Sequence, residues 1–186
     1  MLLMDKRVNQ LTGNFFLVGP MGAGKTTVGK QLAVLLGKTF YDSDHVIVER
    51  CGVAVTTIFE VEGEDGFRCR EKEAIDHLTQ LDNIVLATGG GAVLHEENRL
   101  ALKNRGTVIY LRASVDAILK RTRYDKSRPL LQTSNPRERL NTLMAERDHL
   151  YKEVAHIVVD ANGPTIQALM QKLMHSIQEH HQLKNP

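Results

Sequence analysis

Apolar residues along this chain fall into two kinds of run, and the two kinds alternate. Short continuous runs such as Phe15–Val18 and Ile84–Ala87 are typical of strands that are buried on both faces of a sheet. Longer segments carry apolar residues at helical spacing, as Val28 and Leu32 do within Lys25–Leu36. Strands that alternate with helices form a parallel sheet with helices on both faces, so the pattern predicts an α/β fold in three layers. The expected strands are 15–18, 39–41, 84–87, 107–111 and 156–160, and the expected helices are 25–36, 43–51, 56–61, 65–81, 96–104, 114–123, 136–153 and 165–177.

The spacing of these elements separates a core from less regular parts. Roughly 40 residues lie between the second and third expected strands, although a plain crossover needs only about a dozen. The excess predicts an inserted substrate-binding lobe at about 43–81. The polar, basic segment 124–135 is broken by Pro129, which predicts a mobile lid at about 123–135. We expect residues 1–13 to be loosely held and the tail, about 179–186, to be disordered.

Length and composition narrow the class of protein. The 186 residues, 42% hydrophobic and 25% charged, suit one globular domain spanning 1–186. A net charge of +2 without a basic run interleaved with aromatics does not favour nucleic-acid binding. The sequence has neither a signal segment nor a stretch of about 18 apolar residues, so we expect a cytoplasmic protein that binds no membrane. We also expect a monomer with reduced thiols at Cys51 and Cys69.

The stretch GPMGAGKTT follows the first expected strand and opens the first expected helix. Gly19, Gly24, Lys25 and Thr26 match the pattern GxxxxGK[ST]. Glycines let the backbone turn with its N–H groups inward, Lys25 supplies a charge for the outer phosphates, and Thr26 offers a hydroxyl to magnesium. The helix that follows directs its positive end at the same anion. A glycine-rich turn without a ligand is the alternative, but the flanking strand and helix favour a triphosphate-binding loop at 19–26.

A magnesium carboxylate is expected near this loop. The strand 84–87 ends in Thr88 and glycines, so Asp42 at the end of the second strand is the nearest candidate. Asp42 and Asp44 are two residues apart and share a face in an extended segment. One carboxylate can then serve magnesium while the other accepts a hydrogen bond from a substrate hydroxyl. The alternative is that Asp42 or Ser43 caps the following helix, a role that does not exclude the first.

Further candidates are a glycine triplet at 89–91 and three arginines. The triplet would let the backbone approach a ligand closely and present N–H groups to an anion, although a plain turn is the alternative. Arg128, in the expected lid, is placed to stabilise transition-state charge. Arg68 and Arg147 are candidates for bidentate pairs with a substrate carboxylate. A solvated surface charge is the alternative for each arginine, and the pattern alone does not separate the two.

Taken together, the stretches GPMGAGKTT, FYDSD, EGEDGFRCRE, LATGGGAV, KSRPLL and ERDHLY resemble shikimate kinases along nearly the whole chain. The resemblance implies a P-loop NTPase fold like that of nucleoside monophosphate kinases, with a five-stranded parallel sheet, an inserted shikimate-binding lobe and a lid. It also implies ATP-dependent, Mg²⁺-assisted phosphorylation of the 3-hydroxyl of shikimate in aromatic amino-acid biosynthesis.

The same resemblance implies a role for each matching residue. Residues that would bind ATP are Gly22, Ala23, Gly24, Lys25, Thr26, Thr27, Arg121 and Arg128, and those that would hold magnesium are Thr26 and Asp42. Residues that would bind shikimate are Asp44, Arg68, Gly90, Gly91, Arg147, Phe59 and Phe67, with Glu71 orienting Arg68. The catalytic residues would be Asp44, Lys25 and Arg128. Two positions depart from the family pattern, because Thr26 stands where serine is common and the adenine-side loop 160–164 is short.

Two other functions fit parts of this pattern. A gluconate or nucleoside monophosphate kinase would share the fold and the phosphate loop. A regulatory module that binds ATP without transferring phosphate would lack an acceptor site, and Asp44, Arg68 and the glycine triplet argue against that.

Overall fold

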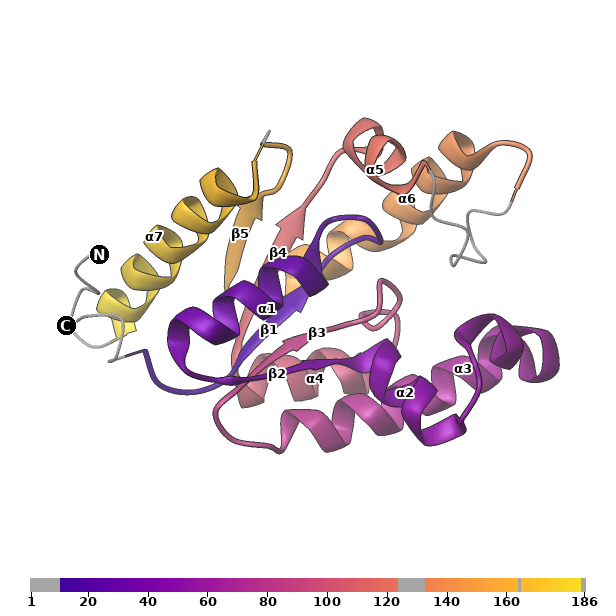
Figure 1. Ribbon diagram of the computed structural model, residues 1–186, viewed down its shortest axis with the longest axis horizontal. Coiled ribbons are helices and arrows are strands. Elements are labelled where there is room, and N and C mark those ends of the chain that lie inside the picture. The colour runs from indigo at the N-terminus through magenta and orange to yellow at the C-terminus, as the bar shows by residue number, and fades with distance from the viewer. Residues whose placement is uncertain (1–10, 124–132, 164, 185–186) are drawn as a thin grey trace.

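The computed structural model describes residues 11–123, 133–163 and 165–184. Strands and helices alternate through most of these ranges (Figure 1). The strands are β1 (Phe15–Val18), β2 (Thr39–Asp42), β3 (Ile84–Ala87), β4 (Thr107–Arg112) and β5 (Ile157–Asp160). The helices are α1 (Lys25–Leu36), α2 (Ser43–Cys51), α3 (Val55–Thr79), α4 (Glu96–Arg105), α5 (Val115–Thr122), α6 (Pro136–Val154) and α7 (Ile166–Lys184).

The five strands form one parallel sheet in the order β2-β3-β1-β4-β5. β1 is central, and its Phe15 lies opposite Val85 of β3 on one side and Thr107 of β4 on the other. The expected α/β fold with a five-stranded parallel sheet is thus confirmed. β2 and β3 lie on one side of β1, and β4 and β5 lie on the other. The loop after β1 is therefore at the switch point of the strand order, where ligands bind in open α/β sheets.

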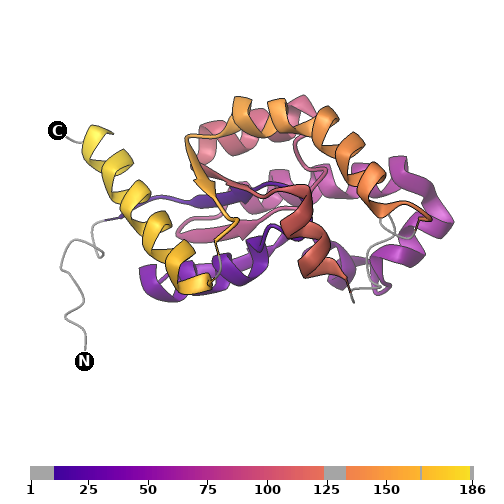
Figure 2. The same cartoon turned by 90° about the horizontal axis from the view of Figure 1, so that it is seen from above.

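Helices cover both faces of the sheet (Figure 2). Alternate side chains of β1 enter different cores: Phe15 and Leu17 pack with α1 and α7, whereas Phe16 and Val18 pack with α3, α4 and α6. This period of two is the one that a strand imposes. The continuous apolar runs in the sequence therefore reflect burial on both faces.

The expected substrate lobe consists of α2 and most of α3, which share a small apolar cluster. Its buried members are Ile47, Ile58, Phe67 and Ala74. α3 is kinked at Gly63, whose φ of 72° and ψ of −175° are not helical. The two helices expected at 56–61 and 65–81 correspond to the two halves of this kinked element. The kink directs the first half away from the line of the second (Figure 1).

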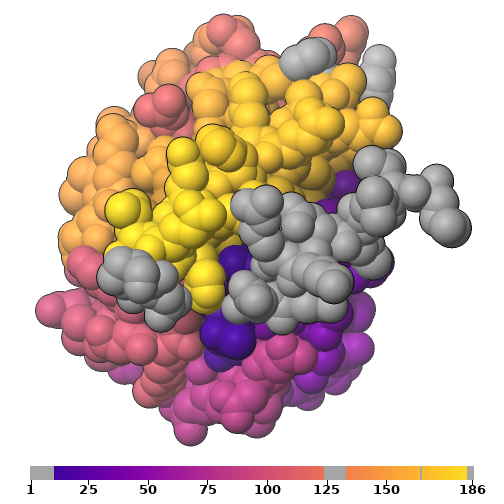
Figure 3. All heavy atoms as spheres, turned by 90° about the vertical axis from the view of Figure 1, so that its left-hand side faces the viewer, coloured from indigo at the N-terminus to yellow at the C-terminus, as the bar shows by residue number. Residues whose placement is uncertain are grey.

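The C-terminal helix is longer than the sequence pattern predicts. We expected a helix to residue 177 and a disordered tail from about 179, but α7 continues to Lys184. The expectation was wrong for 179–184, where the helix continues and the His180 ring lies 5.8 Å from that of His156. The outer surface of α7 forms much of the face drawn in Figure 3. In the described part of the chain, every helix is too short or too polar to cross a membrane.

Candidate functional site

The loop between β1 and α1 has a backbone that only glycines adopt easily. Gly19, Gly22 and Gly24 have φ values of 138°, 73° and 97°. At Gly19 a Cβ atom would also lie 2.6 Å from the carbonyl oxygen of Leu111. Gly24 caps α1 without a side-chain hydrogen bond, which leaves the first amides of the helix available to an anion. The structure therefore has the glycine-dependent turn that the sequence pattern predicts between β1 and α1.

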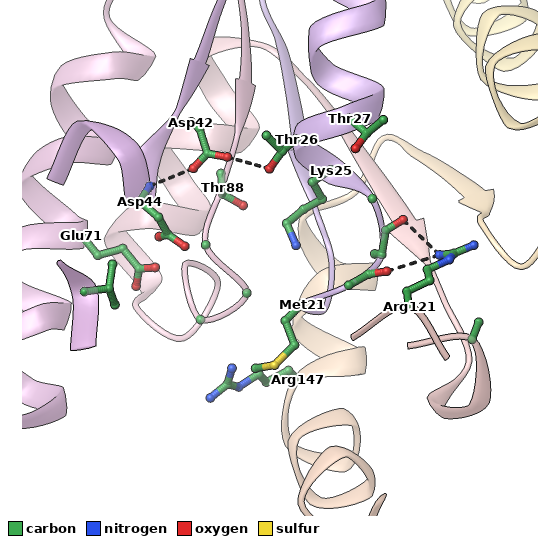
Figure 4. Close-up of a pocket in the computed structure, with 18 of the residues that line it drawn as sticks. Met21, Lys25, Thr26, Thr27, Asp42, Asp44, Glu71, Thr88, Arg121 and Arg147 are labelled. Carbon is green, nitrogen blue, oxygen red and sulfur yellow. Dashed lines mark hydrogen bonds between the residues drawn. The ribbon is translucent and has the colours of Figure 1, made fainter. Parts of the chain in front are cut away.

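Lys25 is folded back across the loop. Its side chain is buried, and Nζ donates hydrogen bonds to the carbonyl oxygens of Gly19 (2.7 Å) and Pro20 (2.8 Å). Figure 4 shows the ammonium group on the cavity side of the loop. The charge is therefore already held where a phosphate would be received.

Thr26 and Asp42 lie side by side, although they come from α1 and β2. The Thr26 hydroxyl donates to Oδ2 of Asp42 at 2.7 Å (Figure 4). Oδ1 of Asp42 accepts the backbone N–H groups of Asp44 (3.1 Å) and His45 (3.4 Å), so Asp42 is the N-cap of α2. The capping alternative and the ligand alternative are thus compatible, because they use different oxygens. In the described ranges, no group of three or more His, Cys, Asp or Glu side chains is placed to hold a metal.

Ser43 does not cap α2. It is fully buried, and its hydroxyl oxygen accepts the backbone N–H of Gly89 at 2.9 Å. The residue between the two aspartates therefore ties the start of α2 to the glycine triplet. Sequence reasoning considered Ser43 only as a cap and missed this contact.

Asp44 projects into a space enclosed by charged groups. Burial, together with the nearby carboxylates of Glu71 and Asp42, raises the pKa of Asp44 to about 7. Its Oδ1 atom is inaccessible and, in the described part of the chain, has no hydrogen-bond partner. A Cβ atom at Gly89 would lie 2.7 Å from this oxygen and 2.5 Å from Oε1 of Glu71. Glycine at position 89 is what leaves room for both carboxylates.

Arg68 is held from two sides in the buried part of the lobe. Nη1 donates to Glu71 at 2.7 Å and Nη2 donates to Glu64 at 2.9 Å. A side chain at Gly91 would overlap the guanidinium group, so the backbone of the triplet lies directly against Arg68. Arg147, from α6, is also buried and reaches the same region beside Met21 (Figure 4). The structure thus brings both arginines to the triplet, an arrangement that the sequence pattern alone did not distinguish from surface charge.

A single cavity of about 1350 Å³ connects these groups. At the lobe end its wall includes Phe59 and Phe67, whose ring centroids are 4.9 Å apart. At the other end it includes Arg121, which donates to carbonyl groups of Gly22 and Ala23 in the phosphate loop. A third bond from Arg121 goes to the carbonyl of Ala161, after β5. Arg128 lies outside the described residues.

A model of the shikimate kinase family matches residues 21–178. The chain belongs to the shikimate kinase family. This match covers most of the chain and runs from the phosphate loop into α7, so it includes both ends of the cavity. It confirms the family that the motifs indicated.

Individual shikimate kinases match at high identity. A shikimate kinase of Nitrosospira multiformis is 60% identical over 162 residues, which cover 87% of this chain and 83% of that protein. One from Chromobacterium violaceum is 57% identical over 167 residues, covering 90% and 91%. A shikimate kinase of Acinetobacter baumannii, solved in complex with shikimate, superposes with a TM-score of 0.88 at 50% identity, covering 90% of this chain and 94% of that one.

The protein is therefore an enzyme with shikimate kinase activity, a kinase of the shikimate pathway in aromatic amino-acid biosynthesis. A gluconokinase of Sinorhizobium meliloti is similar in fold, with a TM-score of 0.58, but is only 15% identical. That likeness extends to the architecture alone. The gluconate alternative and the regulatory-module alternative are thus not supported.

Proposed function

We propose that the enzyme transfers the γ-phosphoryl group of ATP directly to the 3-hydroxyl of shikimate, in the cavity between the phosphate loop and the lobe. The observation that carries the proposal is the continuity of this cavity. It runs from the loop amides and Lys25, past Asp44, to Arg68 and Arg147. One end suits a polyphosphate, and the other suits a small carboxylic acid with hydroxyl groups.

The nucleotide end consists of the loop from Gly22 to Thr27 and Arg121. Backbone N–H groups at the start of α1 would bind the phosphates, and Lys25 would exchange its two carbonyl partners for phosphate oxygens. Arg121 already lies between this loop and the segment after β5, so its guanidinium would border the base.

The hydroxyl of Thr26 and the carboxylate of Asp42 fit a magnesium ion that arrives with the nucleotide. Their oxygens are 2.7 Å apart, they come from two elements that meet beside the loop, and both line the cavity. Hard oxygen donors are what magnesium prefers. When bound, the ion would neutralise charge on the β- and γ-phosphates.

The acceptor end would hold shikimate by its carboxylate. Arg68 and Arg147 both line the cavity, and their buried Nε atoms lack a hydrogen-bond partner in the described part of the chain. The amides of Gly90 and Gly91 border the same space. Glu71 orients Arg68 through the 2.7 Å bond already described. These groups together would give a planar carboxylate several donors.

Asp44 would bind the hydroxyl that is phosphorylated. Asp44 lines the cavity, and its carboxylate has a pKa near neutrality, as a general base requires. Phe59 and Phe67 would flank the ring. The remaining rate enhancement would come from positioning and from cations around the moving group, among them Arg128 carried by the lid.

A coupled assay of ADP release, with and without shikimate, tests this function. We expect ADP release to depend on shikimate and to be negligible with gluconate or nucleoside monophosphates. Phosphorus NMR of the product then locates the phosphate on the 3-oxygen. ADP release that shikimate does not stimulate, or a phosphate on another oxygen, would contradict the proposal. We also propose that the enzyme is a monomer, which light scattering of the purified protein tests, and that it is cytoplasmic, which cell fractionation tests.

A further inference from the structure

Tyr151 lies one helical turn after Arg147 on α6 and is 1% exposed. Its hydroxyl donates a hydrogen bond to the carbonyl oxygen of Gly90. The guanidinium of Arg147 is within hydrogen-bonding reach of the same hydroxyl. Burial raises the pKa of Tyr151 far above its ordinary value, so the hydroxyl keeps its proton and remains a donor. A single side chain thus joins two of the groups that border the acceptor end.

The hydrogen bond to the Gly90 carbonyl orients the whole peptide unit between Gly90 and Gly91. The C=O of Gly90 and the N–H of Gly91 belong to one planar trans peptide unit, in which they point in opposite directions. Fixing the carbonyl therefore fixes the direction of the Gly91 N–H. Glycine on both sides of the unit restrains φ and ψ only weakly, so the plane needs an external anchor.

The carbonyl groups of the other two glycines are held by the backbone, and the N–H of Gly89 is held by the Ser43 hydroxyl. The carbonyl groups of Gly89 and Gly91 accept N–H groups of Ala92 (3.2 Å) and Leu94 (3.0 Å). The carbonyl of Gly90 instead relies on a side chain, that of Tyr151 in α6. Within the described ranges, the N–H groups of Gly90 and Gly91 have no hydrogen-bond acceptor, so both are available to a ligand.

We propose that Tyr151 is a positioning residue for the shikimate carboxylate: it sets the orientation of the Gly90–Gly91 peptide and holds Arg147 beside it. The inference rests on the carboxylate site proposed above. Tyr151 touches no reacting atom, so its effect falls on shikimate binding and not on the chemical step.

Tyr110 offers a matched control in the same core. Its ring stacks on that of Tyr151, with centroids 5.1 Å apart, and it is also fully buried. Its hydroxyl, however, donates to Asp148 at 2.7 Å and not to the triplet. Removing either hydroxyl costs the same core the partly buried hydrogen bond that this hydroxyl donates.

The experiment compares Tyr151→Phe and Tyr110→Phe by calorimetric titration in the presence of MgADP. The ligands are shikimate and its analogue in which the carboxylate is replaced by a hydroxymethyl group. We expect Tyr151→Phe to weaken shikimate binding about tenfold, with the KM for shikimate rising in parallel and kcat changing less than about twofold. Binding of the hydroxymethyl analogue and of MgADP should change little, and Tyr110→Phe should leave all three affinities unchanged.

Several results would overturn the proposal. These are unchanged shikimate affinity in Tyr151→Phe, equal weakening of shikimate and the analogue, or an equal loss in Tyr110→Phe. If the unsubstituted enzyme itself binds shikimate and the analogue equally well, the error lies in the proposed carboxylate site. The unsubstituted chain gives an independent readout, because the Gly91 amide resonance should shift with shikimate and not with the analogue. An unmoved resonance would also count against the proposal.

Discussion

Arg68 is fixed in the acceptor site by the carboxylates of Glu71 and Glu64 and by the missing side chain at Gly91. Two of its nitrogens are engaged within the lobe, while Nε has no partner in the described part of the chain. The planar guanidinium can therefore bind the lobe and a ligand at the same time. A lysine ammonium has the charge without this fork.

Arg68→Lys should weaken shikimate binding by about tenfold or more, because a point charge does not reproduce a bidentate contact. Titration with shikimate measures the change, and MgADP affinity should stay constant. Arg70→Lys is the control, since Arg70 is on the same helix but forms an exposed pair with Glu62. Unchanged shikimate affinity in Arg68→Lys would place the carboxylate elsewhere.

The pKa of Asp44, about 7, gives the enzyme a pH dependence with a definite sign. Burial raises this pKa, so below neutrality the group is protonated and cannot accept the substrate proton. We expect kcat/KM for shikimate to fall about tenfold for each pH unit below 7 and to level off above 8. Asp44→Asn should retain little activity and lose the dependence. A profile of the unsubstituted enzyme that stays flat down to pH 5 would remove Asp44 as the base.

Some residues of the site could be predicted from the sequence, and others could not. Lys25, Thr26, Asp42 and the glycines carry constraints local to one loop or strand end, and such constraints leave a recognisable spacing. Ser43 and Tyr151 act on the glycine triplet across separations of 46 and 61 positions. No local pattern encodes such contacts, so the sequence marked neither residue for its contact with the triplet.

At the scale of elements, the kink in α3 determines how the lobe presents its side chains. Phe59 precedes Gly63, whereas Phe67, Arg68 and Glu71 follow it. A φ of 72° with a ψ of −175° is a region that only glycine enters readily. The sequence indicated two helices here, at 56–61 and 65–81, and the structure has two helical halves that meet at this non-helical glycine.

Gly63→Asn should lower the free energy of unfolding by about 1–3 kcal/mol, because the backbone strain is intrinsic to the conformation. Space is not the cause, since a Cβ at Gly63 would meet nothing within 4 Å. Gly37→Asn is the control: Gly37 also has open space, but its φ of 62° and ψ of 37° are left-handed helical values that asparagine tolerates. Urea unfolding of both variants measures the difference, and equal losses would contradict this account.

At the scale of the whole molecule, the parallel sheet brings its carboxyl-terminal loops to one cavity, while the lobe lies at the margin of that cavity. Alternating apolar runs were sufficient to predict five parallel strands. The order β2-β3-β1-β4-β5 was not predicted, because it depends on pairing between strands distant in sequence. The extra turns of α7 were missed for the same reason, since their partner His156 precedes β5.

Arg128, which the family resemblance assigns to the lid, should act on the transition state and not on acceptor binding. Arg128→Ala is expected to lower kcat by about 10³-fold while shikimate affinity changes little. Steady-state kinetics together with shikimate titration separate the two effects. Lys126→Ala, a neighbouring cation in the same segment, is the control, and equal activity of Arg128→Ala and the parent would exclude Arg128 from the mechanism.

The internal bonds of Lys25 have a consequence for the energetics of nucleotide capture. Because the ammonium already bridges the carbonyls of Gly19 and Pro20, the rotamers of this long side chain are fixed before any ligand binds. Ordering that side chain would otherwise cost up to about 2 kcal/mol of conformational entropy. When a polyphosphate binds, the Lys25 ammonium exchanges the two carbonyl oxygens for phosphate oxygens. Nucleotide binding therefore avoids the loss of side-chain entropy that a solvent-exposed lysine would incur.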